Sequence, residues 1–299
     1  MKYDSRFKKN IGLFELETSN IKLTSWASNL NLMDEIWVPC TSIIDNAREN
    51  GITKPMFLVP HTFDTSIYDK EYTKLNLPLN KKFTFYFIGE MNKRKHLSAL
   101  INAFHSEFEK QELVELVIKV NKFGSTIDSL ANDLKSFCNQ VKDGLRLYKD
   151  LSRYKPEILI TSNISREEIL RLHASCDCFV MPSYGEAWCI PAWEAMAMGK
   201  LVIASATGAM LDYIDPERNG FLVGGTIEPV FGNNETFEEF GTAREKWFDI
   251  SITQLKKTMR RVYEMDQKRK DKVRTEAKLS AKLYDYDKIG KLMKERLSV

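Results

Sequence analysis

Apolar residues along this chain alternate between short runs of strand length and longer segments with helical spacing. The short runs lie at 11–14, 35–38, 56–59, 83–88, 113–120, 157–160, 178–181, 201–204 and 221–223. Helical spacing occurs between them, around Trp26 and at 96–108, 127–141 and 194–198. Ser165, followed three residues later by Glu168, forms a capping-box pattern and predicts the start of a further helix.

Strands that alternate with helices favour parallel pairing through right-handed crossovers. We therefore expect an α/β fold with a Rossmann-like, doubly wound parallel sheet, which binds ligands at the carboxyl ends of its strands. The loops of interest follow Ile88, Ile160, Met181 and Ala204. The polar stretch 66–82 resembles a linker. From about Glu245 the chain is predicted to be helical and highly charged, with a final helix at 286–297.

Composition narrows the range of functions. The 299 residues include 44 basic and 41 acidic side chains, a net charge of +3, so we expect no nucleic-acid partner. The five cysteines are scattered and odd in number, which favours a reducing cytosol and argues against a structural metal site. The N-terminus lacks the long apolar region of a signal peptide, and no apolar run reaches the roughly 18 residues of a membrane span. The expected location is therefore the cytoplasm.

Two carboxylates in an apolar segment form the sharpest chemical feature. Glu186 follows a buried strand, and Glu194 lies eight positions later at an expected helix start. Buried carboxylates are costly without partners, and the hydroxyl pairs of a polyol can serve as such partners. The free N–H groups of a helix start suit a phosphate. Spacing alone agrees equally well with a structural role, in which Glu186 caps a helix and Glu194 pairs with a lysine.

Two further loops could contact a phosphorylated ligand. Lys93, Arg94 and Lys95 directly follow a strand, where three cations can neutralise a diphosphate, although an ordinary basic loop would look the same. The turn at 204–210, which includes Thr207, consists mostly of small residues that let a backbone approach a ligand closely. Tight packing of a strand on a helix would also explain such a turn.

Taken in order, these elements resemble glycosyltransferase family 4 and its relatives, over roughly residues 10 to 223. The matching positions are 59–64, Phe87-Ile88-Gly89 with Arg94-Lys95, 164–169, 177–183, the Glu186/Glu194 pair, 199–205 and 219–223. The resemblance implies a sheet of GT-B type with a partial N-terminal domain. Its implied domains are 1–75, a remnant of the acceptor-side Rossmann-like domain; 76–280, the nucleotide-sugar-binding domain; and 281–299, a C-terminal helix.

The resemblance also implies retaining transfer of a sugar from a nucleotide diphosphate sugar, with no metal or other cofactor. The implied acceptor is a glycan, a lipid or a small molecule. Glu186 would contact the donor sugar and Glu194 the ribose, while Lys95 and Arg94 would stabilise the departing diphosphate. The further substrate-binding positions are Gly89, Ala187, Trp188, Cys189, Ile190, Asn163 and Thr207.

The sequence departs from the family pattern at three places. Ala187-Trp188-Cys189 stands where the family usually has glycines, Glu90 stands where it often has an arginine, and no histidine precedes His61. One alternative function is therefore a catalytically incomplete module that binds a nucleotide sugar or a partner protein, with a second chain or another copy of this chain as the partner. An NAD-dependent oxidoreductase is disfavoured because no G-x-G-x-x-G follows a strand.

Overall fold

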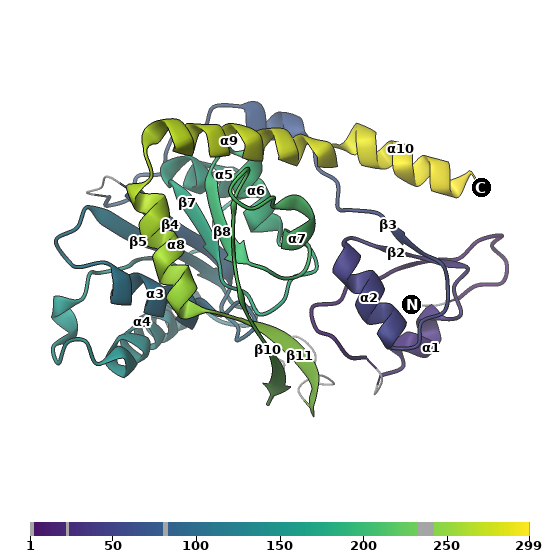
Figure 1. Cartoon of the computed structure of the whole chain (residues 1–299), viewed down its shortest axis with the longest axis horizontal. Coiled ribbons are helices and arrows are strands. Elements are labelled where there is room, and N and C mark those ends of the chain that lie inside the picture. Colours follow the sequence, from purple (N-terminus) through teal and green to yellow (C-terminus); the bar gives the residue numbers. More distant parts are fainter. Residues whose placement is uncertain (1–2, 22–23, 80–82, 233–241, 299) are drawn as a thin grey trace.

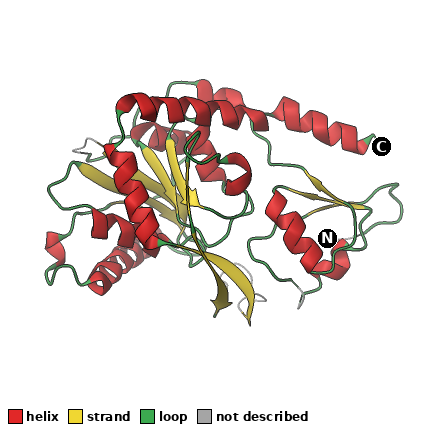
Figure 2. Cartoon of the chain, viewed as in Figure 1, coloured by secondary structure: helices red, strands yellow, loops and turns green. Residues whose placement is uncertain are grey.

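The computed structural model describes residues 3–21, 24–79, 83–232 and 242–298, which form two α/β units (Figures 1 and 2). The larger unit contains a six-stranded, all-parallel sheet with the strand order β6-β5-β4-β7-β8-β9. Its strands are β4 (Phe83–Glu90), β5 (Val114–Asn121), β6 (Ile158–Ile160), β7 (Cys178–Met181), β8 (Leu201–Ser205) and β9 (Phe221–Val223). This order confirms the predicted doubly wound sheet, whose winding direction reverses between β4 and β7.

Right-handed crossovers explain why helices cover both faces of this sheet. The crossovers that lead from β4 towards β6 place α3 (Leu97–Glu107) and α4 (Ile127–Leu145) on one face, where α8 (Ile252–Glu264) joins them. The crossovers that return towards β9 place α5 (Arg166–Ser175), α6 (Ile190–Ala197) and α7 (Met210–Tyr213) on the other face (Figure 1). The later helix α9 (Gln267–Ala281) packs on α6 on that face. The capping box at Ser165 and Glu168 is confirmed.

The smaller unit is a parallel sheet of β1 (Ile11–Leu13), β2 (Glu35–Val38) and β3 (Met56–Leu58), in that order. Its connecting helices, α1 (Trp26–Leu30) and α2 (Thr41–Glu49), lie on one face, and α10 (Tyr286–Leu297) lies on the other (Figure 1). Ile289 of α10 packs against Trp37 and Val59 in a small apolar cluster. The last helix of the chain therefore completes the unit that the first residues begin.

A linker and a last helical layer connect the two units. After β3 the chain forms a short 3₁₀ helix, η1 (Thr65–Asp69), and then runs to Leu79 without a regular element, as expected of a linker. Positions 80–82 of the predicted linker lie outside the described residues. The final helix occupies the predicted range 286–297. In the described part of the chain, no helix has the length and apolar character needed to cross a membrane.

The prediction of a helix from about Glu245 is wrong for the first residues of that segment. An antiparallel hairpin stands there, made of β10 (Gly225–Phe231) and β11 (Thr242–Ile250), and α8 begins only at Ile252. Glu245 and Trp247 are buried while Arg244 and Lys246 are exposed, which is the alternation of a strand. The three-residue spacing between Trp247 and Ile250 also suits one turn of helix, which explains the wrong prediction.

Docking of α10 can be tested by truncating its buried side chain. Ile289→Ala is expected to lower the free energy of unfolding by about 2 kcal/mol, near the lower end of the usual cost because its apolar cluster is small. Leu297→Ala is the matched control on the same helix, because Leu297 is 60% exposed and should change stability by less than about 0.5 kcal/mol. Urea denaturation of both variants measures the difference, and equal effects would contradict the docked position of α10.

Candidate active site at the carboxyl edge of the larger sheet

The loops after β4 and β7 touch each other at the point where the winding of the sheet reverses. Tyr184 N–H donates to the carbonyl oxygen of Arg94 at 2.9 Å. The Arg94 guanidinium donates to the carbonyl oxygen of Gly185 at 2.7 Å. Because β4 and β7 are neighbours in the sheet, the basic loop and the glutamate loop meet at its ligand-binding edge.

Four charged side chains form a buried ion cluster in these loops: Glu17, Arg94, Lys95 and Glu186. Lys95 Nζ lies 2.7 and 3.0 Å from the two carboxylate oxygens of Glu186. Arg94 Nη1 lies 3.2 Å from Glu186 Oε1 and 3.0 Å from Glu17 Oε1. Glu186 is only 4% exposed. The structure thus brings together the three predicted catalytic residues and adds Glu17, which no motif indicates.

Opposing effects set the ionisation of the two carboxylates in the ion cluster. Burial alone would raise the pKa of Glu186, but the charges of Lys95 and Arg94, together with hydrogen bonds to Lys95 and Ser183, hold it below its usual value. Burial raises the pKa of Glu17 above its usual value, because the charges of Arg94 and Lys95 only partly offset the loss of solvent and the repulsion from neighbouring carboxylates. Of the two carboxylates, Glu186 therefore loses its proton more readily.

Glu194 lies at the start of α6 with partners of its own. Tyr68 of η1 donates its hydroxyl to Glu194 Oε1 at 3.0 Å, and Arg166 of α5 forms an ion pair with the same carboxylate. Burial would raise the pKa of Glu194, but its interactions with Arg166 and with His173, whose Nε2 lies 3.7 Å away, keep it below its usual value. The structural alternative paired Glu194 with a lysine, but the cation that stands there is Arg166. About half of the Arg166 side chain remains exposed.

The side chains at 187–189, directly after Glu186, are buried in the structure. Trp188 is buried against the rings of His61, Tyr213 and Tyr284. Cys189 adopts a φ of 67°, a left-handed conformation that favours glycine. Ala187 is also buried, whereas Ile190 is half exposed at the first turn of α6.

Three other predicted substrate-binding residues lie outside the loop between the glutamates: Gly89, Asn163 and Thr207. Gly89 lies within β4, where an added Cβ would meet the ring of Phe87. Asn163 is exposed in the loop after β6. Thr207 adjoins Gly208, where a Cβ would lie 1.9 Å from the carbonyl oxygen of Glu186. In the structure, the small residues of this turn therefore accommodate the backbone of Glu186.

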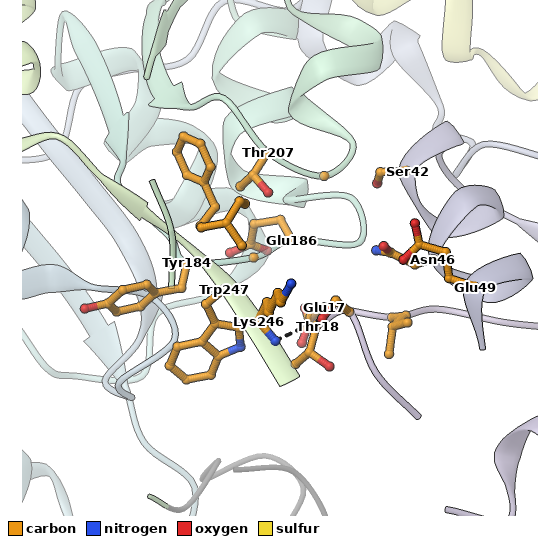
Figure 3. A pocket seen from close by; sticks show the side chains of 16 residues that line it. Glu17, Thr18, Ser42, Asn46, Glu49, Tyr184, Glu186, Thr207, Lys246 and Trp247 are labelled. Carbon is orange, nitrogen blue, oxygen red and sulfur yellow. Dashed lines mark hydrogen bonds between the residues drawn. The ribbon is translucent and has the colours of Figure 1, made fainter. Parts of the chain in front are cut away.

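A pocket of about 240 Å³ opens beside the ion cluster, between the two units (Figure 3). We call it the cleft pocket. Glu186 and Thr207 line it from the larger unit, and Ser42, Asn46 and Glu49 of α2 face it from the smaller one. Glu194 does not line it. Among the described residues, no group of three or more His, Cys, Asp and Glu side chains is placed to hold a metal ion.

Several residues of the site could not be found from local sequence signals. Glu17, Tyr68 and Arg166 reach their partners from segments far apart in the chain. The capping box predicts the start of the helix that carries Arg166. It does not predict that the Arg166 side chain pairs with Glu194. The only usable signal was the cost of burying Glu194, which required some cation nearby.

Sequence comparisons with known proteins identify a family. Residues 69–229 match the family model described as Glycosyl transferases group 1. An uncharacterized glycosyltransferase of Methanocaldococcus jannaschii is 28% identical over 137 residues, which cover 46% of this chain and 30% of that protein.

Solved structures show the same fold at low sequence identity. Sucrose-phosphate synthase from Thermosynechococcus elongatus aligns with a TM-score of 0.67 and 17% identity, covering 92% of this chain and 61% of that chain. HepE of Anabaena, in complex with UDP and glucose, aligns with a TM-score of 0.67 and 16% identity, covering 96% and 71% of the two chains. The chain therefore has the GT-B architecture, and it spans less than two thirds of the synthase.

The ion cluster predicts a strong energetic coupling between Lys95 and Glu186. In a double-mutant cycle of Lys95→Met and Glu186→Gln, we expect a coupling of about 2 kcal/mol in unfolding free energy, because either single change leaves a buried charge poorly compensated. The matched cycle uses Arg218→Met and Asp215→Asn, an ion pair whose side chains are both about half exposed, and should give less than about 1 kcal/mol. Similar values in the two cycles, measured by urea denaturation, would argue against a buried cluster.

Proposed function

This chain belongs to the glycosyl transferases group 1 family, and we propose that it transfers a sugar from a nucleoside diphosphate sugar to an acceptor with retention of anomeric configuration. The observation that carries this proposal is the pair of cations, Lys95 and Arg94, held beside Glu186 where β4 and β7 meet. HepE, a structural neighbour, was determined in complex with UDP and glucose, which supports a nucleotide sugar as the donor.

In this proposal the donor diphosphate lies against Lys95 and Arg94, near the first turn of α6. The bond between the anomeric carbon and the phosphate oxygen breaks, and a new bond forms between that carbon and an acceptor oxygen. The acceptor's hydroxyl proton leaves with the nucleoside diphosphate. Negative charge grows on the departing phosphate, so cations already fixed beside it stabilise the transition state more than the ground state. Glu186 accepts hydrogen bonds from the sugar hydroxyls and shares the two cations with the phosphate.

The nucleoside lies towards Glu194 and Asn163 in this arrangement. Glu194 receives the ribose hydroxyls once Arg166, which is half exposed, turns towards solvent. Tyr68 keeps its hydrogen bond to Glu194 and so holds the carboxylate in position. The proposed location is the cytoplasm, because all five cysteines are free and buried, as suits a reducing compartment.

Nucleotide titration tests the donor site directly. Calorimetry with UDP, GDP and ADP is expected to show saturable binding for one base. Lys95→Ala should weaken that binding by about tenfold to a hundredfold, because a hydrogen bond to a charged group contributes about 1.5–3 kcal/mol. Glu194→Gln should weaken it less, because the amide still accepts one hydrogen bond.

Lys149→Ala is the control for this titration, because Lys149 is an exposed lysine in the loop after α4. Circular dichroism establishes that each variant is folded. A folded wild-type chain that binds none of the three nucleotides would refute the donor site.

A second candidate function, binding of a nucleotide sugar without turnover, is favoured by one observation. In the described structure, Lys95 and Arg94 already have protein partners in Glu186, Glu17 and the carbonyl oxygen of Gly185. A ligand would have to compete for these cations, which lowers their contribution to catalysis. Binding without any turnover would support this second function.

Slow hydrolysis of the donor tests turnover and stereochemistry together. With the donor selected by the titration, for example UDP-glucose, water replaces the acceptor and releases free sugar. Proton NMR recorded before the released sugar equilibrates should show the α-anomer first if the α-configuration of the donor is retained. Glu186→Gln should abolish the signal. Initial appearance of the β-anomer would contradict retention, and the absence of any release would favour the binding module.

A further inference from the structure

A buried histidine, His173, lies beside the carboxylate of Glu194. It belongs to the last turn of α5, and its side chain is fully shielded from solvent. Tyr68 and Arg166 both contact Oε1 of Glu194, whereas His173 Nε2 lies 3.7 Å from Oε2. That separation is longer than a hydrogen bond, and Nε2 has no hydrogen-bond partner among the described residues. Buried polar atoms are normally paired, so this nitrogen requires an explanation.

Tyr86 of β4 holds the other ring nitrogen of His173. The Tyr86 hydroxyl lies 2.7 Å from Nδ1. The tyrosine is completely buried, and burial raises the pKa of its phenol well above the usual value, so the hydroxyl keeps its proton. Burial lowers the pKa of His173 below its usual value, so at neutral pH the ring is uncharged and carries a single proton. The hydrogen bond to Tyr86 therefore decides which nitrogen carries that proton.

The neighbours of the ring select one tautomer of His173. When Tyr86 donates its hydroxyl proton to Nδ1, the ring proton stands on Nε2, beside the Glu194 carboxylate. The opposite tautomer would place the lone pair of Nε2 beside a negative charge and would leave the buried Tyr86 proton without this acceptor. Both consequences are unfavourable. Tyr86 and His173 thus supply Glu194 with an N–H donor from inside the core.

His173 and Arg166 differ in how easily they can leave Glu194. About half of the Arg166 side chain is exposed, so water can take over its hydrogen bonds. The ring of His173 is enclosed and stays in place. Closing its gap to a hydrogen bond of about 3 Å needs a shift of only about 0.7 Å between Nε2 and Oε2. The orphaned N–H is therefore in reserve beside a carboxylate whose present cation is replaceable.

We propose that His173 is a positioning residue, whose Nε2–H takes the place of Arg166 at Glu194 when the hydroxyls of a ribose bind to that carboxylate. This inference rests on the proposed function, because it takes Glu194 as the ribose-binding residue. Without the His173 donor, release of Arg166 would leave a buried carboxylate poorly compensated. Arg166 would then stay, and the ribose hydroxyls would lose their acceptor. Tyr86 acts one step further away, by fixing the tautomer.

Nitrogen-15 NMR of the histidine rings tests the donor on the whole chain without nucleotide. A His173→Gln spectrum assigns the His173 signals among those of the four histidines. We expect a protonated Nε2 and an unprotonated Nδ1. Arg166→Gln removes the competing cation and should move the Nε2 proton downfield, because its hydrogen bond to Glu194 shortens. Arg171→Gln is the control on the same helix, since Arg171 donates to the carbonyl oxygen of Thr73, and it should cause no such shift.

Two replacements of similar size separate the roles of the two ring nitrogens. His173→Gln keeps an N–H near the position of Nε2, whereas His173→Asn keeps an acceptor near Nδ1 and loses the donor. Calorimetry compares UDP, or the nucleoside diphosphate that the titration selects, with its 2′,3′-dideoxy analogue. For the wild type, loss of the ribose hydroxyls should weaken binding by at least about tenfold, as expected for hydrogen bonds to a charged group. His173→Gln should keep this ratio, and His173→Asn should lower it to about threefold or less.

His105→Asn is the matched control, because His105 is a buried histidine of the same unit that contacts Glu157 instead of Glu194. It should leave the ratio of the two affinities unchanged, since a ratio cancels any general loss of folded protein. Circular dichroism establishes that each variant is folded. If His173→Asn does not fold, the NMR signals of the wild type and of Arg166→Gln decide the role of His173.

Three results would overturn the proposal: a protonated Nδ1, a Nε2 proton that Arg166→Gln leaves unmoved, or equal ratios for His173→Gln and His173→Asn. A wild-type chain that binds no nucleotide would refute the donor site and, with it, the ribose half of this inference. The NMR experiment would still decide whether His173 donates to Glu194, so the two failures are distinguishable.

Discussion

A buried carboxylate must be paired with cations, and this requirement at Glu186 organises the cleft. Removing an ion from water costs several kcal/mol unless partners replace the solvent. Lys95 and Arg94 supply those partners from the loop after β4, and Arg94 reaches on to Glu17. These ion pairs therefore connect two loops of the larger sheet to the N-terminal segment. A phosphorylated ligand would enter a site whose positive groups are already oriented.

Much of the fold followed from the spacing of apolar residues. Strands and helices of the larger unit alternate with clear periods, and crossover handedness then placed the chemical loops at one edge of the sheet. Lys95 and Glu186 are 91 residues apart in sequence, yet this topology argument put their loops side by side. Local patterns combined with the handedness of crossovers were therefore sufficient to predict that these two loops meet.

Other contacts depended on information that local patterns lack. The partners of Glu194 come from η1 and α5, and no spacing in the sequence links Tyr68 or Arg166 to that carboxylate. The hairpin was missed because Trp247 and Ile250 are three residues apart, which suits one turn of helix as well as an irregular strand. Pairing with β10 and packing against Tyr184 and the N-terminal segment distinguish the two conformations.

The position of α10 also has a consequence for how the protein is made. Lys9 donates to the carbonyl oxygen of Arg296, 287 residues further along the chain. During synthesis, β1 to β3 therefore leave the ribosome long before the helix that covers their second face. Trp37 and Val59 stay uncovered until Ile289 emerges, whereas the larger sheet can assemble earlier from strands close in sequence. Strands β1 to β3 precede the larger unit in the chain and are thus among the last elements to become fully buried, and a ribosome that stalls before α10 would display an apolar surface to chaperones.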